Sequence, residues 1–403
     1  MRHMHRRIAL PLTLAVAWVL AACQADQGAS VAPSDAPSPS AEATPEPTAS
    51  SEPSVVPSPE DSQEPTESAW TEAGTFSGSG LTMIVDVSAW DGGFVAIGQR
   101  WPEANMATGV PTPLVWTSTD GREWTESEPP WTPSLQPRGI LRLSAGGVIV
   151  IGVDGADAAA WTSTDGATWT DVALPFGVEA NSGLNVVSGP VGHVVTTAEG
   201  IWYSAEGTAW ELTHAVPEGV GLQQPVAGDE GFVVPATQLT GEGAPIVFAS
   251  GDGIEWVQAT PAAYLSSIAP FRGDWLATGF TDDPPAISLL RSTNGLEWTV
   301  GMNVDDLLPA DGPHAGPGME REINQVTLAG ESGVLAMTMG WNHCCAQPAM
   351  GVRVFTSADG TTWAEAGLAD GAFVTAAATD GEVAVLAGYV ARGASAVFWV
   401  TDR

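Results

Sequence analysis

The stretch Ser163-Thr164-Asp165-Gly166-Ala167-Thr168-Trp169 decides the fold, because the chain repeats it. Asp-Gly between two apolar runs is a strong signal for a β-hairpin, since both turn residues must accept a positive φ. The Ser and Asp side chains can bond neighbouring backbone amides, and the Trp supplies a large apolar body for packing against an adjoining unit. The stretch therefore predicts a β-hairpin whose polar residues are structural.

The pattern Ser-x-(Asp/Glu/Asn)-Gly-x-x-Trp occurs six times, and the copies are 45, 41, 46, 42 and 65 residues apart. The turn positions of the successive copies are Asp120, Asp165, Glu206, Asp252, Asn294 and Asp359. A calcium site is the alternative to a structural turn. We disfavour it because so short a turn cannot gather the roughly six to eight oxygens that Ca²⁺ takes.

A second periodic feature, an apolar alternation broken by a Gly turn, occurs seven times between these hairpins, for example at Gly92-Gly93-Phe94. Each period of about 40–45 residues thus holds four short strands, which is the unit of a β-propeller blade. The chain ends carry half-copies: residues 397–402 match the first strand of the hairpin, and the segment around Trp70 matches the second. The sequence predicts an all-β, seven-bladed propeller over residues 68–403, with the last blade shared between the termini so that no sheet edge is left open.

The hairpin resembles the Asp-box, or BNR, repeat of sialidase-like propellers, although all six copies have one residue fewer between acid and Gly. The resemblance implies that a sialidase would need an Arg triad, a Tyr nucleophile with its Glu, and an Asp acid, on six blades rather than seven. The available residues in or beside long connections are Arg100, Arg138, Arg321 and Arg392, with Tyr264 and Tyr389. No local motif ties them together, so a sialidase-type exo-glycosidase is the alternative function.

The first 67 residues are not part of the predicted fold. Residues 1–22 have a basic start and a short apolar run, which is typical of a secretory signal peptide and too short for a membrane-spanning helix. The four residues Leu20-Ala21-Ala22-Cys23 resemble the bacterial lipobox, which implies a diacylated, palmitate-type Cys23 as the mature N-terminus. Residues 23–67 are rich in Pro, Ser and Glu and are predicted to be a disordered linker, because they cannot bury enough apolar area to fold. The expected location is the extracytoplasmic face of the cell membrane, with the membrane itself as a partner.

Composition excludes one class of partner. The chain has 47 acidic residues against 13 basic ones, a net charge of −34, and no basic stripe for phosphates, so we expect no nucleic-acid partner. No cofactor is expected either.

The long connections fall on the end of the propeller opposite the Gly and Asp-Gly turns, and long loops on a rigid scaffold often carry function. The candidate ligand-facing aromatics there are Trp101, Trp131, Tyr264 and Trp341. The accompanying acids are Asp305, Asp306, Asp311, Glu320 and Glu322. Aromatics beside carboxylates suit a sugar, a peptide or a cation, whereas the structural alternative is that the Trp residues pack their own loops and the acids are solvated.

Cys344 and Cys345 follow His343, and His314 lies in the preceding insert. In an oxidising compartment the two thiols are expected to form a strained vicinal disulfide, with free thiols and a zinc or copper site as alternatives. The predicted function is a membrane-anchored lipoprotein whose propeller binds a carbohydrate, peptide or protein without catalysis. A purely structural spacer is a third class.

Overall fold

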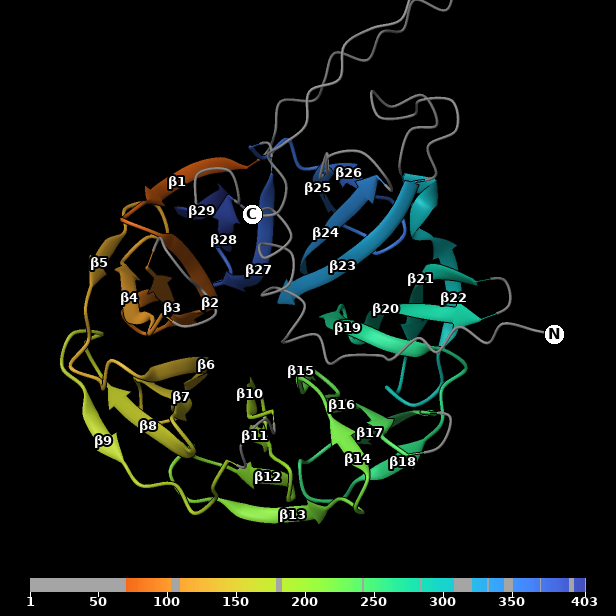
Figure 1. Ribbon diagram of the computed structural model, residues 1–403, viewed down its shortest axis with the longest axis horizontal. Helices are drawn as coiled ribbons and strands as arrows, with labels where there is room; N and C mark the ends of the chain where they lie inside the picture. Colours follow the sequence, from red (N-terminus) through yellow and green to blue (C-terminus); the bar gives the residue numbers. More distant parts are fainter. Residues whose placement is uncertain are drawn as a thin grey trace, which may run out of the picture. The chain divides into compact units, whose positions relative to one another are not determined.

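The computed structural model describes residues 70–102, 109–178, 183–240, 243–282, 285–307, 321–331, 333–343, 351–369, 371–390 and 395–402. Within the compact unit Ser68–Arg403, seven antiparallel sheets stand in a ring (Figure 1). The all-β, seven-bladed propeller predicted from the repeats is therefore confirmed. The N-terminal segments predicted as signal peptide, Cys23 and linker lie outside the described residues.

Each blade has an innermost strand at the ring centre and an outermost strand at the rim, and we number the blades in chain order. Blade 1 consists of β2 (Leu81–Trp90), β3 (Gly93–Trp101), β4 (Thr112–Ser118) and β5 (Thr125–Ser127). Blade 2 consists of β6 (Leu135–Arg142), β7 (Val148–Asp154), β8 (Asp157–Ser163) and β9 (Thr170–Val172). Blade 3 consists of β10 (Asn185–Gly189), β11 (Gly192–Thr196), β12 (Gly200–Ser204) and β13 (Glu211–Ala215). Blade 4 consists of β14 (Val220–Leu222), β15 (Val226–Gly228), β16 (Gly231–Gln238), β17 (Pro245–Ser250) and β18 (Val257–Ala259). Blade 5 consists of β19 (Tyr264–Phe271), β20 (Asp274–Asp282), β21 (Pro285–Ser292) and β22 (Thr299–Asn303). Blade 6 consists of β23 (Arg321–Glu331), β24 (Val334–His343), β25 (Gly351–Thr356) and β26 (Ala364–Glu365). Blade 7 consists of β27 (Ala372–Thr379), β28 (Val383–Val390), β29 (Ser395–Asp402) and β1 (Thr71–Phe76).

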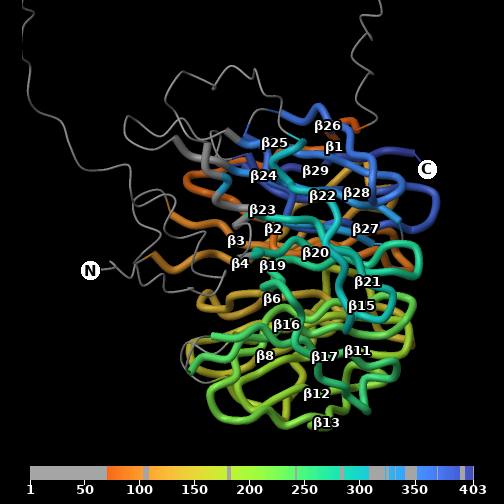
Figure 2. Tube along the Cα trace, turned by 90° about the vertical axis from the view of Figure 1, so that its right-hand side faces the viewer, coloured from red at the N-terminus to blue at the C-terminus, as the bar shows by residue number. Residues whose placement is uncertain are grey.

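The two ends of the chain share blade 7. Strand β1 pairs antiparallel with β29, from Thr71 opposite Val400 to Phe76 opposite Ala396. This pairing gives blade 7 its fourth strand, as the half-copies at the two ends predict. Figure 2 shows the ring from the side, with β1 and β29 at the top of the view and β12 and β13 of blade 3 at the bottom, across the ring.

The hydrophobic core is divided into seven clusters, one in each interface between neighbouring blades. The interface of blades 7 and 1 is rich in aromatics: Phe398 is fully buried and stacks on Trp124, the motif Trp of blade 1, with ring centroids 3.8 Å apart. Motif Trp residues thus pack between blades, where large apolar surfaces stabilise the ring.

The order of the strands puts the connections at two ends of the ring. The turns between first and second strands and between third and fourth strands lie at one end, which we call the turn face. The connections between second and third strands, and from one blade to the next, lie at the other end, which we call the long-loop face. The one described helix is the short 3-10 turn η2 (Val304–Leu307), and no described helix is long and apolar enough to cross a membrane.

Candidate functional site

The polar residues of the turn face are used by their own hairpins. In all six motif copies the motif Gly donates its backbone N–H to the motif Ser Oγ at 2.8–2.9 Å. In five copies the side-chain Oδ1 of the Asp or Asn also accepts two backbone N–H groups, as Asp165 does from Ala167 at 2.9 Å and from Thr168 at 2.6 Å. These bonds favour the ionised carboxylate and lower the pKa of Asp165 to about 2. The geometry is that of side chains which stabilise their own turn, here called the turn lock, rather than that of a ligand site.

Trp131 is not a ligand-facing residue. It is 6% exposed and packs against Trp161, with centroids 5.6 Å apart, and edge-on against the motif Trp169, with centroids 5.0 Å apart. The long connection between blades 1 and 2 therefore folds its Trp down into the interface between these blades. For this residue the structural alternative, a Trp that packs its own loop, is the correct one.

The other candidates on the long-loop face are only partly open to description. Trp101 ends β3 and Tyr264 begins β19, and both side chains are half-buried, while Asp305 and Asp306 of η2 are exposed. The backbone places Trp341 and His343 on β24 and Glu322 on β23, but their side chains lie outside the description. Asp311, His314, Glu320, Cys344 and Cys345 lie outside the described residues altogether. Among the residues described, no group of three or more His, Cys, Asp or Glu is placed to hold a metal ion.

Two arginines of neighbouring blades have opposite surroundings. Arg100 of β3 donates to both carboxylate oxygens of Glu126, at 2.7 and 2.9 Å, and its Nε donates to Thr82 Oγ1 at 3.2 Å. Glu126 also accepts a bond of 3.1 Å from Trp116 Nε1. Arg100 is therefore a structural residue that ties the strands of blade 1 together.

Among the described residues, Arg138 has no such partner. It occupies a β-bulge of β6, the innermost strand of blade 2, where the register shifts between Pro137 and Gly139. Its Nε is buried and makes no hydrogen bond within the described part of the chain. Burial lowers the pKa of the guanidinium, which nevertheless stays charged at any physiological pH. A buried donor without a partner is costly, and Arg138 as a whole is only half-buried, so part of the residue is open to solvent.

The innermost strands also carry a second, paired set of charges that sequence reasoning missed. At the turn-face ends of β6 and β23, Arg142 forms an ion pair with Glu331, which joins blade 2 to blade 6. Burial, together with the charge of Asp86, raises the pKa of Glu331 to about 7, although Arg142 opposes the shift. About a quarter of the Glu331 side chain is accessible, so it lies deep in the ring without being sealed from water.

Asp86 forms a hydrogen bond across the interface between blades 1 and 2. Its Oδ2 accepts the backbone N–H of Ile140 on β6 at 2.8 Å, and its Oδ1 accepts that of Val87 at 2.8 Å. Burial raises the pKa of Asp86 to about 6. A sequence signal existed, because Asp86 interrupts the apolar run of β2.

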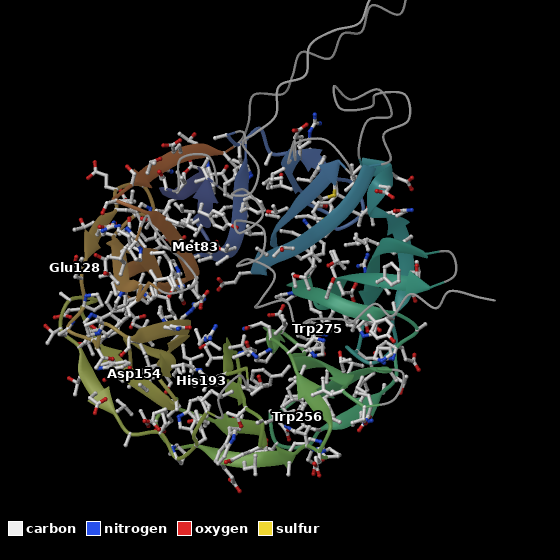
Figure 3. All side chains as sticks on the ribbon, in the orientation of Figure 1. Met83, Glu128, Asp154, His193, Trp256 and Trp275 are labelled. Atoms are coloured by element: carbon white, nitrogen blue, oxygen red, sulfur yellow. The ribbon has the colours of Figure 1, made fainter. Side chains whose placement is uncertain are left out.

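His193 of β11, labelled in Figure 3, is connected to the backbone of Arg142 through Ser188. It is 4% exposed, and its Nδ1 lies 2.9 Å from Ser188 Oγ, which in turn accepts the backbone N–H of Arg142 from the neighbouring blade. Burial lowers the pKa of His193 to about 4, so the ring is neutral near pH 7. Ser188 makes the bond between blades 2 and 3, and His193 positions its hydroxyl.

Tyr389, one of the two Tyr residues available to a sialidase-type site, lies in blade 7. It is 8% exposed and stacks on Phe373, with centroids 5.0 Å apart and ring planes 8° apart. Burial raises the pKa of Tyr389 to about 12, which opposes formation of the phenolate. These surroundings do not suit a nucleophile.

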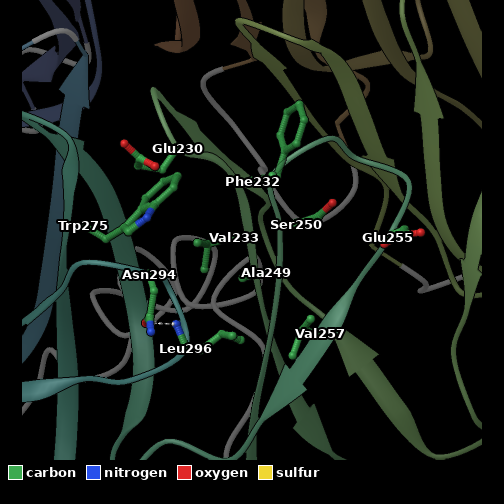
Figure 4. A pocket seen from close by; sticks show the side chains of 11 residues that line it. Glu230, Phe232, Val233, Ala249, Ser250, Glu255, Val257, Trp275, Asn294 and Leu296 are labelled. Carbon is green, nitrogen blue, oxygen red and sulfur yellow. Dashed lines mark hydrogen bonds between the residues drawn. The ribbon is translucent and has the colours of Figure 1, made fainter.

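A pocket of about 200 Å³ opens on the turn face between blades 4 and 5 (Figure 4). Its floor is apolar and includes Phe232, Val233 and Trp275, and two carboxylates, those of Glu230 and Glu255, line it as well. The sequence did not predict this pocket, because the search for ligand-facing residues followed the long connections at the opposite end of the ring.

Comparison with known proteins supports the fold. No family model matches the chain, and no curated protein matches it. Among solved structures, the chain is similar to virginiamycin B lyase from Staphylococcus aureus, with a TM-score of 0.50 and 12% identity over 82% of this chain and 98% of the other. It is also similar to the phage phi92 endosialidase (TM-score 0.44, 8% identity, 83% of this chain and 69% of the other) and to the Penicillium chrysogenum α-L-arabinanase (TM-score 0.38, 12% identity, 81% and 96%). These structural neighbours are β-propeller proteins, and at such identity the likeness to the lyase is one of fold alone.

Proposed function

We propose that the protein is a membrane-anchored extracytoplasmic lipoprotein whose propeller is a non-catalytic binding module for a glycan, peptide or protein. The anchoring rests on the lipobox resemblance at Cys23 and on the predicted linker up to residue 67. Diacylation supplies two chains, which stable anchoring requires, since a single acyl chain binds a membrane only marginally. Intact mass of the mature protein tests this part: a chain that begins at any residue other than a diacylated Cys23 would refute it.

The observation that carries the binding function is the unpartnered Arg138. It lies four residues into β6, on the long-loop side of Arg142, and it projects from a bulge, a device that re-aims a side chain. Asp86, an acid of the neighbouring strand β2, accepts the backbone N–H groups of Val87 and Ile140, one on each oxygen. Arg138 is therefore available for a carboxylate, carbonyl or hydroxyl oxygen of a ligand, with which a charge-assisted hydrogen bond would form.

The non-catalytic assignment is supported by the state of the residues that a sialidase-type enzyme would use. Arg100 is bound bidentately by Glu126, and Tyr389 is buried with a raised pKa. Arg138 is thus the one arginine with a described side chain, among those predicted for a triad, that is free to meet a ligand.

The test compares wild-type protein with Arg138→Met on glycan and peptide arrays, followed by assay on a panel of fluorogenic glycosides. We expect binding that is lost in Arg138→Met and retained in Arg272→Met, because Arg272 is exposed on a turn-face hairpin of blade 5. Equal binding by wild type and Arg138→Met would refute the role of Arg138. Glycoside turnover that disappears in Arg138→Met would establish the exo-glycosidase alternative instead.

A further inference from the structure

The pocket between blades 4 and 5 lies where one copy of the repeat has a small residue. The position before the motif Ser is Thr117, Thr162, Tyr203, Arg291 or Thr356 in five copies, and it is Ala249 in blade 4. In blades 1 and 3 this side chain packs beneath the next hairpin: a Cβ placed on Gly166 would lie 2.6 Å from Thr117 Cγ2, and one placed on Gly253 would lie 2.3 Å from Tyr203 Cδ2. In blade 4 a Cβ placed on Gly295 would lie 2.4 Å from Val233 Cγ2 and 3.4 Å from Ala249 Cβ, so Val233 supplies most of this contact and the small Ala249 lines the pocket beside it.

The walls of the pocket are apolar, and the Ser250 hydroxyl and the Asn294 side-chain carbonyl oxygen are already used. Val257 lies opposite Ala249 in the β17–β18 ladder and is 57% exposed, and Leu296 faces it from the hairpin of blade 5. Ser250 Oγ accepts the N–H of Gly253 at 2.8 Å, and Asn294 Oδ1 accepts the N–H of Leu296 at 3.0 Å, the bond drawn in Figure 4. A sugar would find few uncharged hydrogen-bond partners here, whereas an alkyl chain would bury its apolar surface against these walls.

The charge at the pocket is negative. Glu230, on the turn between β15 and β16, and Glu255, on the motif hairpin, are both exposed, and neither has an ion pair within the described residues. The basic residues of blade 5 are directed elsewhere: Arg291 pairs with Asp274, and Arg272 lies over Phe271, with its Cζ 5.3 Å from the ring centroid. Apolar walls with two unpaired carboxylates match a long alkyl stem that ends in a cation.

We propose that this pocket accepts a lysine side chain of a basic partner protein. The four-carbon stem lies against Trp275, Val233 and Val257, and the ammonium group meets Glu255, while Glu230 on the opposite side of the pocket adds to the negative potential (Figure 4). The net charge of −34 attracts a basic partner at long range and speeds its encounter with this face. This site is separate from the Arg138 site and does not depend on it.

The test measures binding of two small probes to the full chain by following the Trp275 indole N–H resonance, assigned with Trp275→Phe. The probes are Nα-acetyl-lysine methylamide and its uncharged analogue Nα-acetyl-norleucine methylamide. We expect a saturable shift with the lysine probe and weaker binding of the norleucine probe. Ala249→Thr should abolish the shift; it restores the residue that blades 1, 2 and 6 carry, so it should fold.

A matched pair of variants isolates the charge. Glu255→Gln should weaken the lysine probe about two- to five-fold, the usual range for a solvent-accessible ion pair. Glu123→Gln removes the same charge at the same motif position of blade 1, where Thr117 fills the space, and should leave binding unchanged. The proposal is overturned by an absent or non-saturable shift, by equal binding of both probes, or by unchanged binding in Ala249→Thr.

Discussion

Replacing Arg100 and Arg138 by Met applies one chemical change to two arginines in opposite surroundings. Breaking a buried ion pair by removing one partner costs about 3–5 kcal/mol. The side chains of Arg100 and Glu126 are 20% and 25% exposed, and Glu126 keeps its bond from Trp116, so we expect Arg100→Met to lose about 2 kcal/mol. Arg138→Met instead removes a buried donor that has no partner, and it should gain about 1 kcal/mol of unfolding free energy.

Urea denaturation of the full chain at neutral pH, followed by tryptophan fluorescence and by far-UV circular dichroism, measures both changes. Methionine keeps an unbranched apolar stem in each case, so the comparison isolates the guanidinium. A loss of more than about 1 kcal/mol in Arg138→Met would contradict the removal of a buried donor that has no partner. That result would mean that groups within the propeller hold the guanidinium, and the assignment of Arg138 to a ligand would fall with it.

Three further predictions concern the ring itself. Deleting residues 397–403 should prevent cooperative folding, because it removes the partner of β1 and opens two sheet edges; a protease-resistant product of native circular dichroism would contradict this. Ser163→Ala should cost about 1–3 kcal/mol in urea melts, because the buried N–H of Gly166 loses its acceptor at 2.8 Å, and an unchanged midpoint would refute the turn lock. The raised pKa of Glu331 means that the folded state binds its proton more tightly than the unfolded state does. The stability that this group contributes is therefore complete below its usual pKa of 4.5 and is lost as pH rises through about 7. Glu331→Gln should flatten this decline when the free energy of unfolding is measured against pH. An equal decline in the variant would exclude Glu331 as its source.

The fold was predictable because its deciding information is local. A hairpin whose turn needs positive φ at Gly166, bonded by Ser163 and Asp165, is specified within seven residues, and its repetition specifies the ring. The pairing of β1 with β29 followed from matching half-copies at the chain ends. The β-bulges of the innermost strands were not predictable, since one extra residue in an apolar run leaves no distinct pattern.

The site was less predictable because its contacts are non-local. Arg100 and Arg138 look alike in the sequence, and only the arrangement of blade 1 brings Glu126 to one of them. Trp131 lies in a long connection, as a ligand-facing residue would, yet it packs into the interface below. The pocket beside Ala249 did have a signal: aligning the six motif copies on their Ser shows a single Ala where larger side chains recur.

The pairing of β1 with β29 has a mechanical consequence. The chain before Trp70 continues directly into β1, the outermost strand of blade 7, so a pull on that segment is borne first by the β1–β29 ladder. Its load begins at the pair Thr71–Val400 and reaches Phe76–Ala396 last, with a register shift between Glu72 and Gly74 on the way. Tension applied through the N-terminal segment therefore acts on the β1–β29 pairing that closes the ring. The force at which these two short strands separate sets the force that the whole propeller can sustain.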